Sequence, residues 1–298
     1  MDIRKIAVVG AGMMGQGIAQ QCAISGLDVV LLDVSEIALQ KAAAAIALGL
    51  ARLAEQDKIT GKDCDGALIR IRQSTDYASA ATANLFIEAA TENLALKADI
   101  LGKIEAVSSP EAVIATNTSS LSITRLSAVL TNRARFIGMH FFNPVAVLQL
   151  VEVARGLSTS DATHAAVLRF CERIGKRPIS VRNSPGFLVN RLLCPMINEA
   201  IFALQENVAT AEEIDLGMKL GCNQPIGPLA LGDLIGLDTL LAIMQVLESD
   251  FGDQKFRPAR LLVEMVDAGR LGRKTGRGFF TYGASTVRQG KVAAASER

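Results

Sequence analysis

Apolar runs and amphipathic segments alternate along the first half of the chain. The segments between the runs are long enough to cross from one strand to the next as helices. Strands that alternate with helices form parallel sheets covered on both faces, and such strands read as nearly continuous apolar runs. The pattern predicts an α/β domain built on a doubly wound parallel sheet, with strands at residues 6–9, 29–32, 85–89, 113–116 and 136–142.

The helical pattern from Ser35 to Lys58 is unusually long for a connection between two strands. Polar and charged side chains lie off its apolar stripe, as is typical of an amphipathic helix. We therefore expect a helical-hairpin arm that projects from the sheet. The stripe consists of Leu39, Ala43, Ile46, Leu50 and Leu53.

Strand patterns end after a last short run at residues 179–181. Ser184 and Pro185 then resemble a helix cap and a first helical residue. We expect an α/β domain at 1–183, an all-helical domain at 184–283 and a flexible tail at 284–298, because the tail is polar, small and aperiodic. The helical domain has amphipathic patterns at residues 188–204, 211–221 and 231–248.

Composition narrows the classes of function. The chain has 298 residues, 50% of them hydrophobic, and 31 basic residues balance 30 acidic ones. A balanced charge gives no field that would attract nucleic acid or an anionic membrane surface, so the expected partner is a small molecule. Neither a signal peptide nor an uninterrupted membrane-spanning run is visible, which predicts a cytoplasmic protein. The five cysteines never form CxxC, so we expect neither disulfides nor a metal site.

The first apolar run leads into a glycine motif. Gly10, Gly12 and Gly15 form G-x-G-x-x-G between a predicted strand and a predicted helix. In a dinucleotide site the first glycine permits the tight turn, the second lets backbone approach the pyrophosphate, and the third allows close helix packing. The motif predicts a Rossmann-like dinucleotide site in which Met13 and Met14 also contact the cofactor.

Asp33 ends the second predicted strand, where an acidic side chain can accept hydrogen bonds from both ribose hydroxyls of an adenosine. A 2′-phosphate would be repelled by this carboxylate, and Val34, Ser35 and Glu36 supply no arginine to neutralise it. The sequence therefore predicts NAD, rather than NADP, as the cofactor.

The chain has two histidines, and His140 lies within an apolar run. If residues 136–153 form a hairpin centred on Ala146, His140 and Glu152 lie opposite each other, because both are equally far from the centre. A carboxylate on one ring nitrogen would leave the other as a proton acceptor, which predicts an acid/base pair. A core histidine satisfied by a neighbouring acid remains the alternative. We expect His164, in a polar stretch, to be a solvated helix residue.

Several motifs together resemble those of the short-chain L-3-hydroxyacyl-CoA dehydrogenases, most closely the bacterial 3-hydroxybutyryl-CoA dehydrogenases. The resemblance runs in order from about Ile3 to Tyr282. The glycine motif is shared with many families, whereas GMHFFNP together with NSPGFLVNR is specific to this one. The motifs are GAGMMGQGIAQ, EAATENLALK, ATNTSSLSI, GMHFFNPV, LVEV, NSPGFLVNR, GCNQPIGPLALGDLIGLD and GRKTGRGFF.

The resemblance implies roles for individual residues. His140 would be the catalytic base and Glu152 the acid that orients it. Ser119 and Asn190 would bind substrate near the reacting hydroxyl, with Asn190 contributed by the helical domain. Besides the glycine motif and Asp33, cofactor contacts would come from Glu92, Lys97, Asn117, Ser119, Asn143 and Lys274.

The resemblance also implies an activity, namely NAD-dependent interconversion of (S)-3-hydroxybutyryl-CoA and acetoacetyl-CoA by a homodimer that associates through its helical domains. The arm would hold coenzyme A through Gly49, Arg52 and Lys58, although the lysine run of relatives is thinned here and Gln149 departs from the family pattern. The alternatives are a sugar-acid dehydrogenase of the gulonate dehydrogenase or lambda-crystallin type, a lysine-dependent β-hydroxyacid dehydrogenase and a non-catalytic NAD-binding protein. Acyl-chain range, direction and pathway are left open by the sequence.

Overall fold

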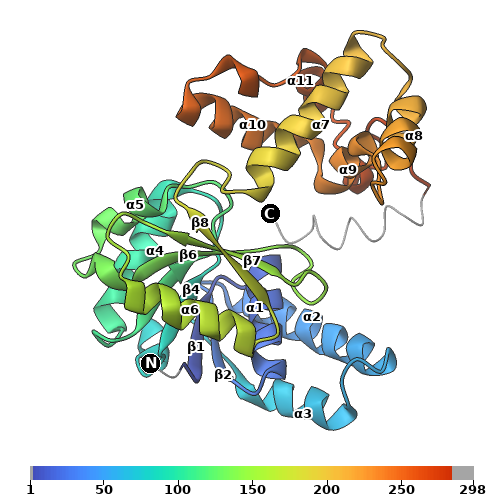
Figure 1. The fold of residues 1–298 in the computed structure, drawn as a ribbon. Coiled ribbons are helices and arrows are strands. Elements are labelled where there is room, and N and C mark those ends of the chain that lie inside the picture. The colour runs from blue at the N-terminus through green and yellow to red at the C-terminus, as the bar shows by residue number, and fades with distance from the viewer. Residues whose placement is uncertain (1–2, 284–298) are drawn as a thin grey trace. The chain divides into compact units, whose positions relative to one another are not determined.

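The computed structural model describes residues 3–283, so the predicted tail lies outside the described residues. The chain divides into two units, Met1–Ser184 and Pro185–Arg298. The first unit contains a sheet with helices on both faces and the second is helical (Figure 1). The predicted fold class, a doubly wound sheet with a helical arm followed by an all-helical domain, is confirmed.

The sheet has eight strands in the order β3-β2-β1-β4-β5-β6-β7-β8. All neighbours pair in parallel except β6 and β7, which form an antiparallel pair. The chain order reverses between β1 and β4, and in such sheets ligands bind outside the carboxyl ends of the strands at this switch point. The strands are Lys5–Val9, Asp28–Leu32, Ile71–Ser74, Leu85–Glu88, Val113–Thr116, Phe136–Phe141, Leu150–Arg155 and Arg177–Arg182.

Alternate strand residues face two separate layers of helix. Leu85 and Ile87 of β4 belong to the core that also includes α1, α2 and α6, whereas Phe86 between them points to the opposite face, where α4 packs on β4 and β5. Burial on both faces explains why the central strands read as apolar runs. The helices of this unit are α1 Met13–Ile24, α2 Glu36–Glu55, α3 Gly61–Arg70, α4 Leu94–Val107, α5 Ile123–Leu126 and α6 Asp161–Arg173.

The predicted arm is the helical hairpin of α2 and α3. The Ser35 hydroxyl caps α2 by accepting a hydrogen bond from Ala38, and Thr60 forms a capping box with Asp63 at α3. Among the described residues α2 is long and apolar enough to cross a membrane by length and composition alone, which for a single helix is weak evidence of a membrane span. Here α2 packs against α1 and α3.

The sequence patterns missed β3, the edge strand that follows α3. Its four residues, Ile71 to Ser74, are all half-buried or exposed. An edge strand with little buried surface carries no apolar run, so the period-2 signal is weak. This strand completes the second parallel crossover that begins at β2.

Two helix predictions for the second unit were wrong. Ser184 and Pro185 do not start a helix, because Gly186 and Phe187 take left-handed φ angles of 69° and 47°, and α7 begins only at Val189. The helix predicted at 231–248 is broken at Gly236 (φ 102°) into two helices bent by 97°. The helices of this unit are α7 Val189–Gln205, α8 Ala211–Gly221, α9 Pro228–Ile235, α10 Leu237–Phe251 and α11 Arg260–Asp267.

Candidate active site

The glycine motif forms the turn between β1 and α1 at the switch point of the sheet. Gly10 has φ 110°, and a Cβ there would lie 2.7 Å from the Ala89 carbonyl oxygen at the end of β4. A Cβ on Gly15 would overlap the Gly10 carbonyl oxygen. A Cβ built on Gly12 would meet no heavy atom of the described residues within 4 Å apart from its own neighbours along the chain, so backbone is open to a ligand there. Each glycine thus has the geometry expected of a dinucleotide site.

Asp33 closes the same site from the end of β2. Its Oδ2 accepts a hydrogen bond from the Ala11 backbone N–H at 2.8 Å, and its Oδ1 accepts one from the Ser35 backbone N–H at 2.9 Å. A carboxylate held against the glycine loop can accept further hydrogen bonds from ribose hydroxyls. The residues present therefore fit an adenine dinucleotide without a 2′-phosphate.

His140 and Glu152 are direct partners in the antiparallel β6–β7 pair, as the hairpin register predicted. His140 Nδ1 lies 2.7 Å from Glu152 Oε2, and the two residues are 7% and 0% exposed. A carboxylate can only accept, so a hydrogen bond between an ionised Glu152 and His140 requires the hydrogen on Nδ1. This is the arrangement that orients a histidine for proton transfer.

The segment after β6 lies next to the glycine motif. Asn143 Nδ2 is 3.3 Å from Met13 Sδ at the start of α1, and a Cβ on Gly17 would lie 2.9 Å from Val145. The predicted cofactor residues Met13 and Asn143 are therefore neighbours, although 130 positions separate them.

Ser119 lies in the turn after β5, and Glu92 organises this turn. Glu92 Oε1 accepts hydrogen bonds from the Thr118 hydroxyl at 2.5 Å, from the Ser119 backbone N–H at 2.9 Å and from the Ser120 backbone N–H at 3.2 Å. Burial alone would raise the pKa of Glu92, but the Lys97 ammonium and these hydrogen bonds hold that pKa below its ordinary value. Glu92 is therefore an ionised carboxylate at neutral pH.

Asn117 connects this turn to the catalytic strand. Its Oδ1 accepts a hydrogen bond from the Phe141 backbone N–H at 2.9 Å, one residue beyond His140. Ser119 and His140 thus belong to two adjoining strand ends that one amide side chain ties together. The sequence motif had suggested a cofactor contact for Asn117 but not this tie.

Sequence reasoning missed Glu88, the last residue of β4. This carboxylate is 0% exposed and lies 2.9 Å from the Nζ atom of Lys97, which is also fully buried. The signal was an acidic residue that ends a strand buried on both faces, because a buried charge needs a partner. The structure places the ammonium of Lys97 in the interior, between this acid and Glu92.

The remaining predicted residues lie on the arm or in the second unit. Arg52 and Lys58 are exposed, whereas Gly49 faces α1 so closely that a Cβ would lie 2.5 Å from Gln20 Oε1. Asn190 is half-buried as the second residue of α7. Lys274 Nζ forms an ion pair of 2.6 Å with Asp238 Oδ2.

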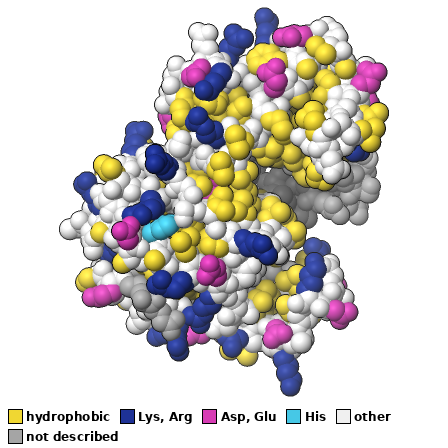
Figure 2. Space-filling view, in the orientation of Figure 1, with side chains coloured by type: hydrophobic (Ala, Val, Ile, Leu, Met, Phe, Trp, Pro, Cys, Tyr) yellow, Lys and Arg dark blue, Asp and Glu magenta, His cyan; other side chains and the backbone are white. Residues whose placement is uncertain are grey.

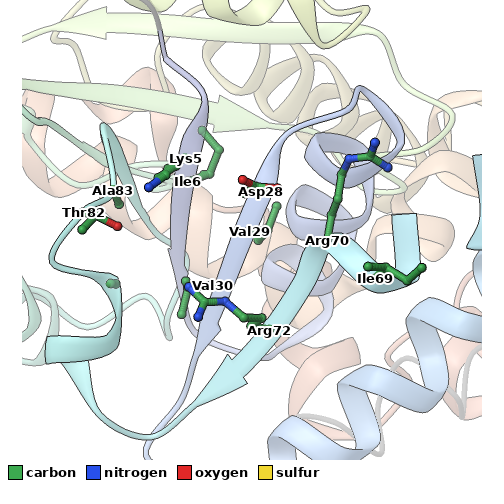
Figure 3. A pocket seen from close by; sticks show the side chains of 11 residues that line it. Lys5, Ile6, Asp28, Val29, Val30, Ile69, Arg70, Arg72, Thr82 and Ala83 are labelled. Atoms are coloured by element: carbon green, nitrogen blue, oxygen red, sulfur yellow. The ribbon is translucent and has the colours of Figure 1, made fainter. Parts of the chain in front are cut away.

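A cavity of about 280 Å³ lies at the amino-terminal ends of β1, β2 and β3, opposite the glycine motif (Figure 3). Lys5 and Asp28 start β1 and β2 there, and Arg70 and Arg72 flank the start of β3. Parallel α/β sheets bind cofactors at the carboxyl ends of their strands, so this cavity is not the candidate active site. Within residues 3–283, no group of three or more His, Cys, Asp or Glu side chains could hold a metal ion.

Comparison with known families assigns both units. Residues 5–184 match the model of the 3-hydroxyacyl-CoA dehydrogenase NAD-binding domain, and residues 186–282 match that of the C-terminal domain of the same enzymes. The chain belongs to the 3-hydroxyacyl-CoA dehydrogenase family. The family resemblance inferred from the motifs and the prediction of NAD as cofactor are both confirmed.

Individual members of the 3-hydroxyacyl-CoA dehydrogenase family match over nearly the whole chain. A probable 3-hydroxybutyryl-CoA dehydrogenase of Bacillus subtilis is 47% identical over 96% of this chain and 100% of its own length. The 3-hydroxybutyryl-CoA dehydrogenase of Bradyrhizobium diazoefficiens is 48% identical over 96% of this chain and 98% of its own. The crystal structure of (S)-3-hydroxybutyryl-CoA dehydrogenase from Ralstonia eutropha is 57% identical, with a TM-score of 0.92, and covers 95% of this chain and 100% of that one. The chain is thus an NAD-dependent dehydrogenase of this family.

Replacing Gly15 with alanine tests the cofactor site of this 3-hydroxyacyl-CoA dehydrogenase. The added methyl group would overlap the Gly10 carbonyl oxygen, so the turn must shift, and we expect NADH binding to be lost and stability to fall by about 1–3 kcal/mol. NADH fluorescence titration and thermal unfolding measure the two effects. Gly102→Ala, on the exposed side of α4 with open space around it, is the matched control and should raise stability by about 0.5–1 kcal/mol. Wild-type NADH affinity in Gly15→Ala would contradict the assignment.

Proposed function

We propose that the protein interconverts (S)-3-hydroxybutyryl-CoA and acetoacetyl-CoA, using the His140–Glu152 pair as its acid/base. The observation that carries the proposal is the 2.7 Å distance between Nδ1 of His140 and Oε2 of Glu152. His140 lies on β6, and the loop that follows β6 contacts the glycine motif through Asn143 and Met13. The names of the similar enzymes from Bradyrhizobium diazoefficiens and Ralstonia eutropha support the substrate class.

The glycine motif and Asp33 would hold NAD, whose nicotinamide would supply the hydride acceptor for C3 of the substrate in oxidation and the hydride donor in reduction. Nε2 of His140 takes the proton from the C3 hydroxyl in the oxidising direction and gives it back in reduction. Glu152 keeps the hydrogen on Nδ1 and stabilises the imidazolium. Such proton transfer typically contributes about 10² to 10⁴ in rate. Ser119 and Asn190 orient the substrate oxygens.

The cofactor side has its own assignment. We propose that the glycine motif with Met13 and Met14 holds the pyrophosphate, that Asp33 holds the adenosine ribose, and that further contacts come from Glu92, Lys97, Asn117, Ser119, Asn143 and Lys274. Coenzyme A would lie against the arm near Arg52 and Lys58, since both side chains are exposed and can pair with phosphate. Gly49 would act only by allowing α1 to approach.

We also propose a cytoplasmic homodimer that associates through the helical unit, with residues 1–183 binding NAD and 184–283 serving substrate binding and association. Leu192, Leu220 and Leu234 of this unit are 64%, 78% and 52% exposed, and Figure 2 shows hydrophobic side chains on its visible surface. Association sites are marked by contiguous apolar patches, and these exposed leucines are the positions around which we propose that such a patch forms.

The test of the proposal follows NADH oxidation with acetoacetyl-CoA, longer 3-ketoacyl-CoA thioesters and free acetoacetate. Fast turnover confined to the thioesters supports the proposal and ranks chain length. A folded, NADH-binding protein that turns over none of the thioesters would favour the sugar-acid dehydrogenase or the non-catalytic alternative, and gulonate oxidation separates those two.

Replacing NADH with NADPH in the same assay tests Asp33. The 2′-phosphate replaces the 2′-hydroxyl, so one hydrogen bond to the Asp33 carboxylate is lost, worth about 1.5–3 kcal/mol because a charge takes part. We expect kcat/KM for NADPH to be lower by about 10- to 100-fold, since 1.4 kcal/mol is a factor of ten. Asp33→Asn should narrow the difference by removing the charge. An equal or higher kcat/KM with NADPH would contradict the role of Asp33.

A further inference from the structure

Glu88 is a buried carboxylate to which the proposed mechanism gives no role. It ends β4 at the switch point of the sheet and is 0% exposed. Its Oε1 accepts from the Ala90 backbone N–H at 2.7 Å and from Lys97 Nζ at 2.9 Å, and its Oε2 accepts from the Thr116 hydroxyl at 2.5 Å. An acid with this many partners is held in one position.

Lys97 bridges Glu88 to Glu92. Its Nζ donates to both oxygens of Glu88, at 2.9 and 3.0 Å, and to the Ala90 carbonyl oxygen at 3.1 Å. Glu92 Oε2 lies farther away, at 3.5 Å. An ammonium has three hydrogens, and the two oxygens of Glu88 and the Ala90 carbonyl accept all three. Glu92 is therefore attracted by the charge of Lys97 without forming a short hydrogen bond to it.

Glu92 is therefore able to turn its other oxygen to the loop that carries Ser119. Oε1 accepts from the Ser119 hydroxyl at 3.2 Å and the Ser120 hydroxyl at 3.3 Å, besides the bonds from Thr118 and the two backbone N–H groups. The loop is held at its other end as well, because the Asn117 backbone N–H donates to the Glu88 carbonyl oxygen at 2.6 Å. Residues 116–120 are thus anchored to Glu88 both directly and through Lys97 and Glu92.

We propose that Glu88 is a positioning residue that fixes the Ser119 loop by holding Lys97 away from Glu92. Two carboxylates share one ammonium in this cluster, and Glu88 has the closer contacts. When Glu88 loses its charge, Glu92 is the remaining anionic partner of Lys97 in the cluster. The contact between Lys97 and Glu92 then shortens, and Glu92 loses hydrogen bonds to the loop. The effect on catalysis rests on the proposed function, because Ser119 orients substrate there.

The first variant is Glu88→Gln, which keeps the shape and an acceptor for Thr116 but removes the charge. Glu105→Gln is the matched control. Glu105 also caps a loop in the same unit, accepting from the Thr131 and Asn132 backbone N–H groups and pairing with Arg135, but near the amino ends of β5 and β6. Both variants should lower the melting temperature, so stability alone does not distinguish them.

The distinguishing readouts are hydrogen exchange and steady-state kinetics. Without any ligand, the backbone amides of residues 118–120 should exchange at least about 10-fold faster in Glu88→Gln, where each tenfold reflects 1.4 kcal/mol of lost loop stability. Their exchange rates should be the same as wild type in Glu105→Gln. With acetoacetyl-CoA, kcat should fall by about 10- to 100-fold, since misplacement of a positioning group acts on the reacting geometry. KM for NADH should rise as well, because Glu92, Lys97 and Ser119 are proposed cofactor contacts. Glu105→Gln should keep wild-type kcat below its melting temperature.

The double variant Glu88→Gln/Lys97→Met provides a rescue by removing the unbalanced ammonium. Glu92 should return to the loop, and exchange at 118–120 should slow toward the wild-type rate. If Glu88→Gln fails to fold, Thr116→Val removes one bond to Glu88 and should give a smaller change of the same kind. Wild-type exchange and kcat in a folded Glu88→Gln would overturn the proposal. If the wild-type protein does not turn over the thioester, the proposed function fails, whereas the exchange experiment still tests Glu88.

Discussion

Replacing His140 with alanine is expected to lower kcat for acetoacetyl-CoA reduction by about 10² to 10⁴, the usual contribution of a general acid or base. The loss should be confined to the chemical step, because the glycine motif and Asp33 bind the cofactor without His140. Steady-state kinetics with NADH and an NADH binding titration measure the two quantities. The affinity for NADH should stay within about threefold of wild type, less than 1 kcal/mol.

His164 offers the control within the same chain. It lies in α6, and its Nε2 is 2.8 Å from the Ser180 hydroxyl in a hydrogen bond at the protein surface. His164→Ala should keep wild-type kcat. A His140→Ala variant that turns over as fast as His164→Ala would remove His140 from the mechanism.

Replacing Glu152 with glutamine is expected to lower kcat by about 10² or more. The amide no longer stabilises a positive imidazolium, and its NH₂ group can also hold His140 in the wrong tautomer. Groups that act as a unit are strongly non-additive in their effects on rate. The double variant His140→Ala/Glu152→Gln should therefore be no slower than His140→Ala alone, which a double-mutant cycle on kcat measures. Independent, multiplying losses would show that the two residues do not act together.

The patterns that predicted the fold correctly were those in which burial alone determines the sequence. Central strands such as β4 and β5 are covered on both faces and read as apolar runs, and the His140–Glu152 register follows from the length of a hairpin. The edge strand β3 and the bend at Gly236 left no such signal. The bend needs one residue with positive φ inside a continuous amphipathic pattern, and the glycine that supplies it looks like any other helical glycine.

The side-chain network around Glu88 could not be predicted for a different reason. Glu88, Lys97 and Thr116 belong to β4, α4 and β5, and they meet only because β4 and β5 are neighbours in the sheet. Sequence alone shows a glutamate at the end of an apolar run and a lysine in a helix, each of which is ordinary. Pairing them requires the three-dimensional order of strands, which local patterns do not contain.

The antiparallel β6–β7 pair restricts how this chain can be lengthened or shortened. Neighbouring residues on a strand point to opposite faces of the sheet. A residue inserted at the exposed positions 146–149, beyond the buried Val145, extends the connecting loop and leaves the strands as they are. The same insertion between Leu150 and Glu152 places a different side chain opposite His140 and turns the glutamate away. Tolerance of length variation thus changes within a few positions. The exposed end of the loop at 146–149 can accept a foreign insertion, whereas β7 must keep its register with His140.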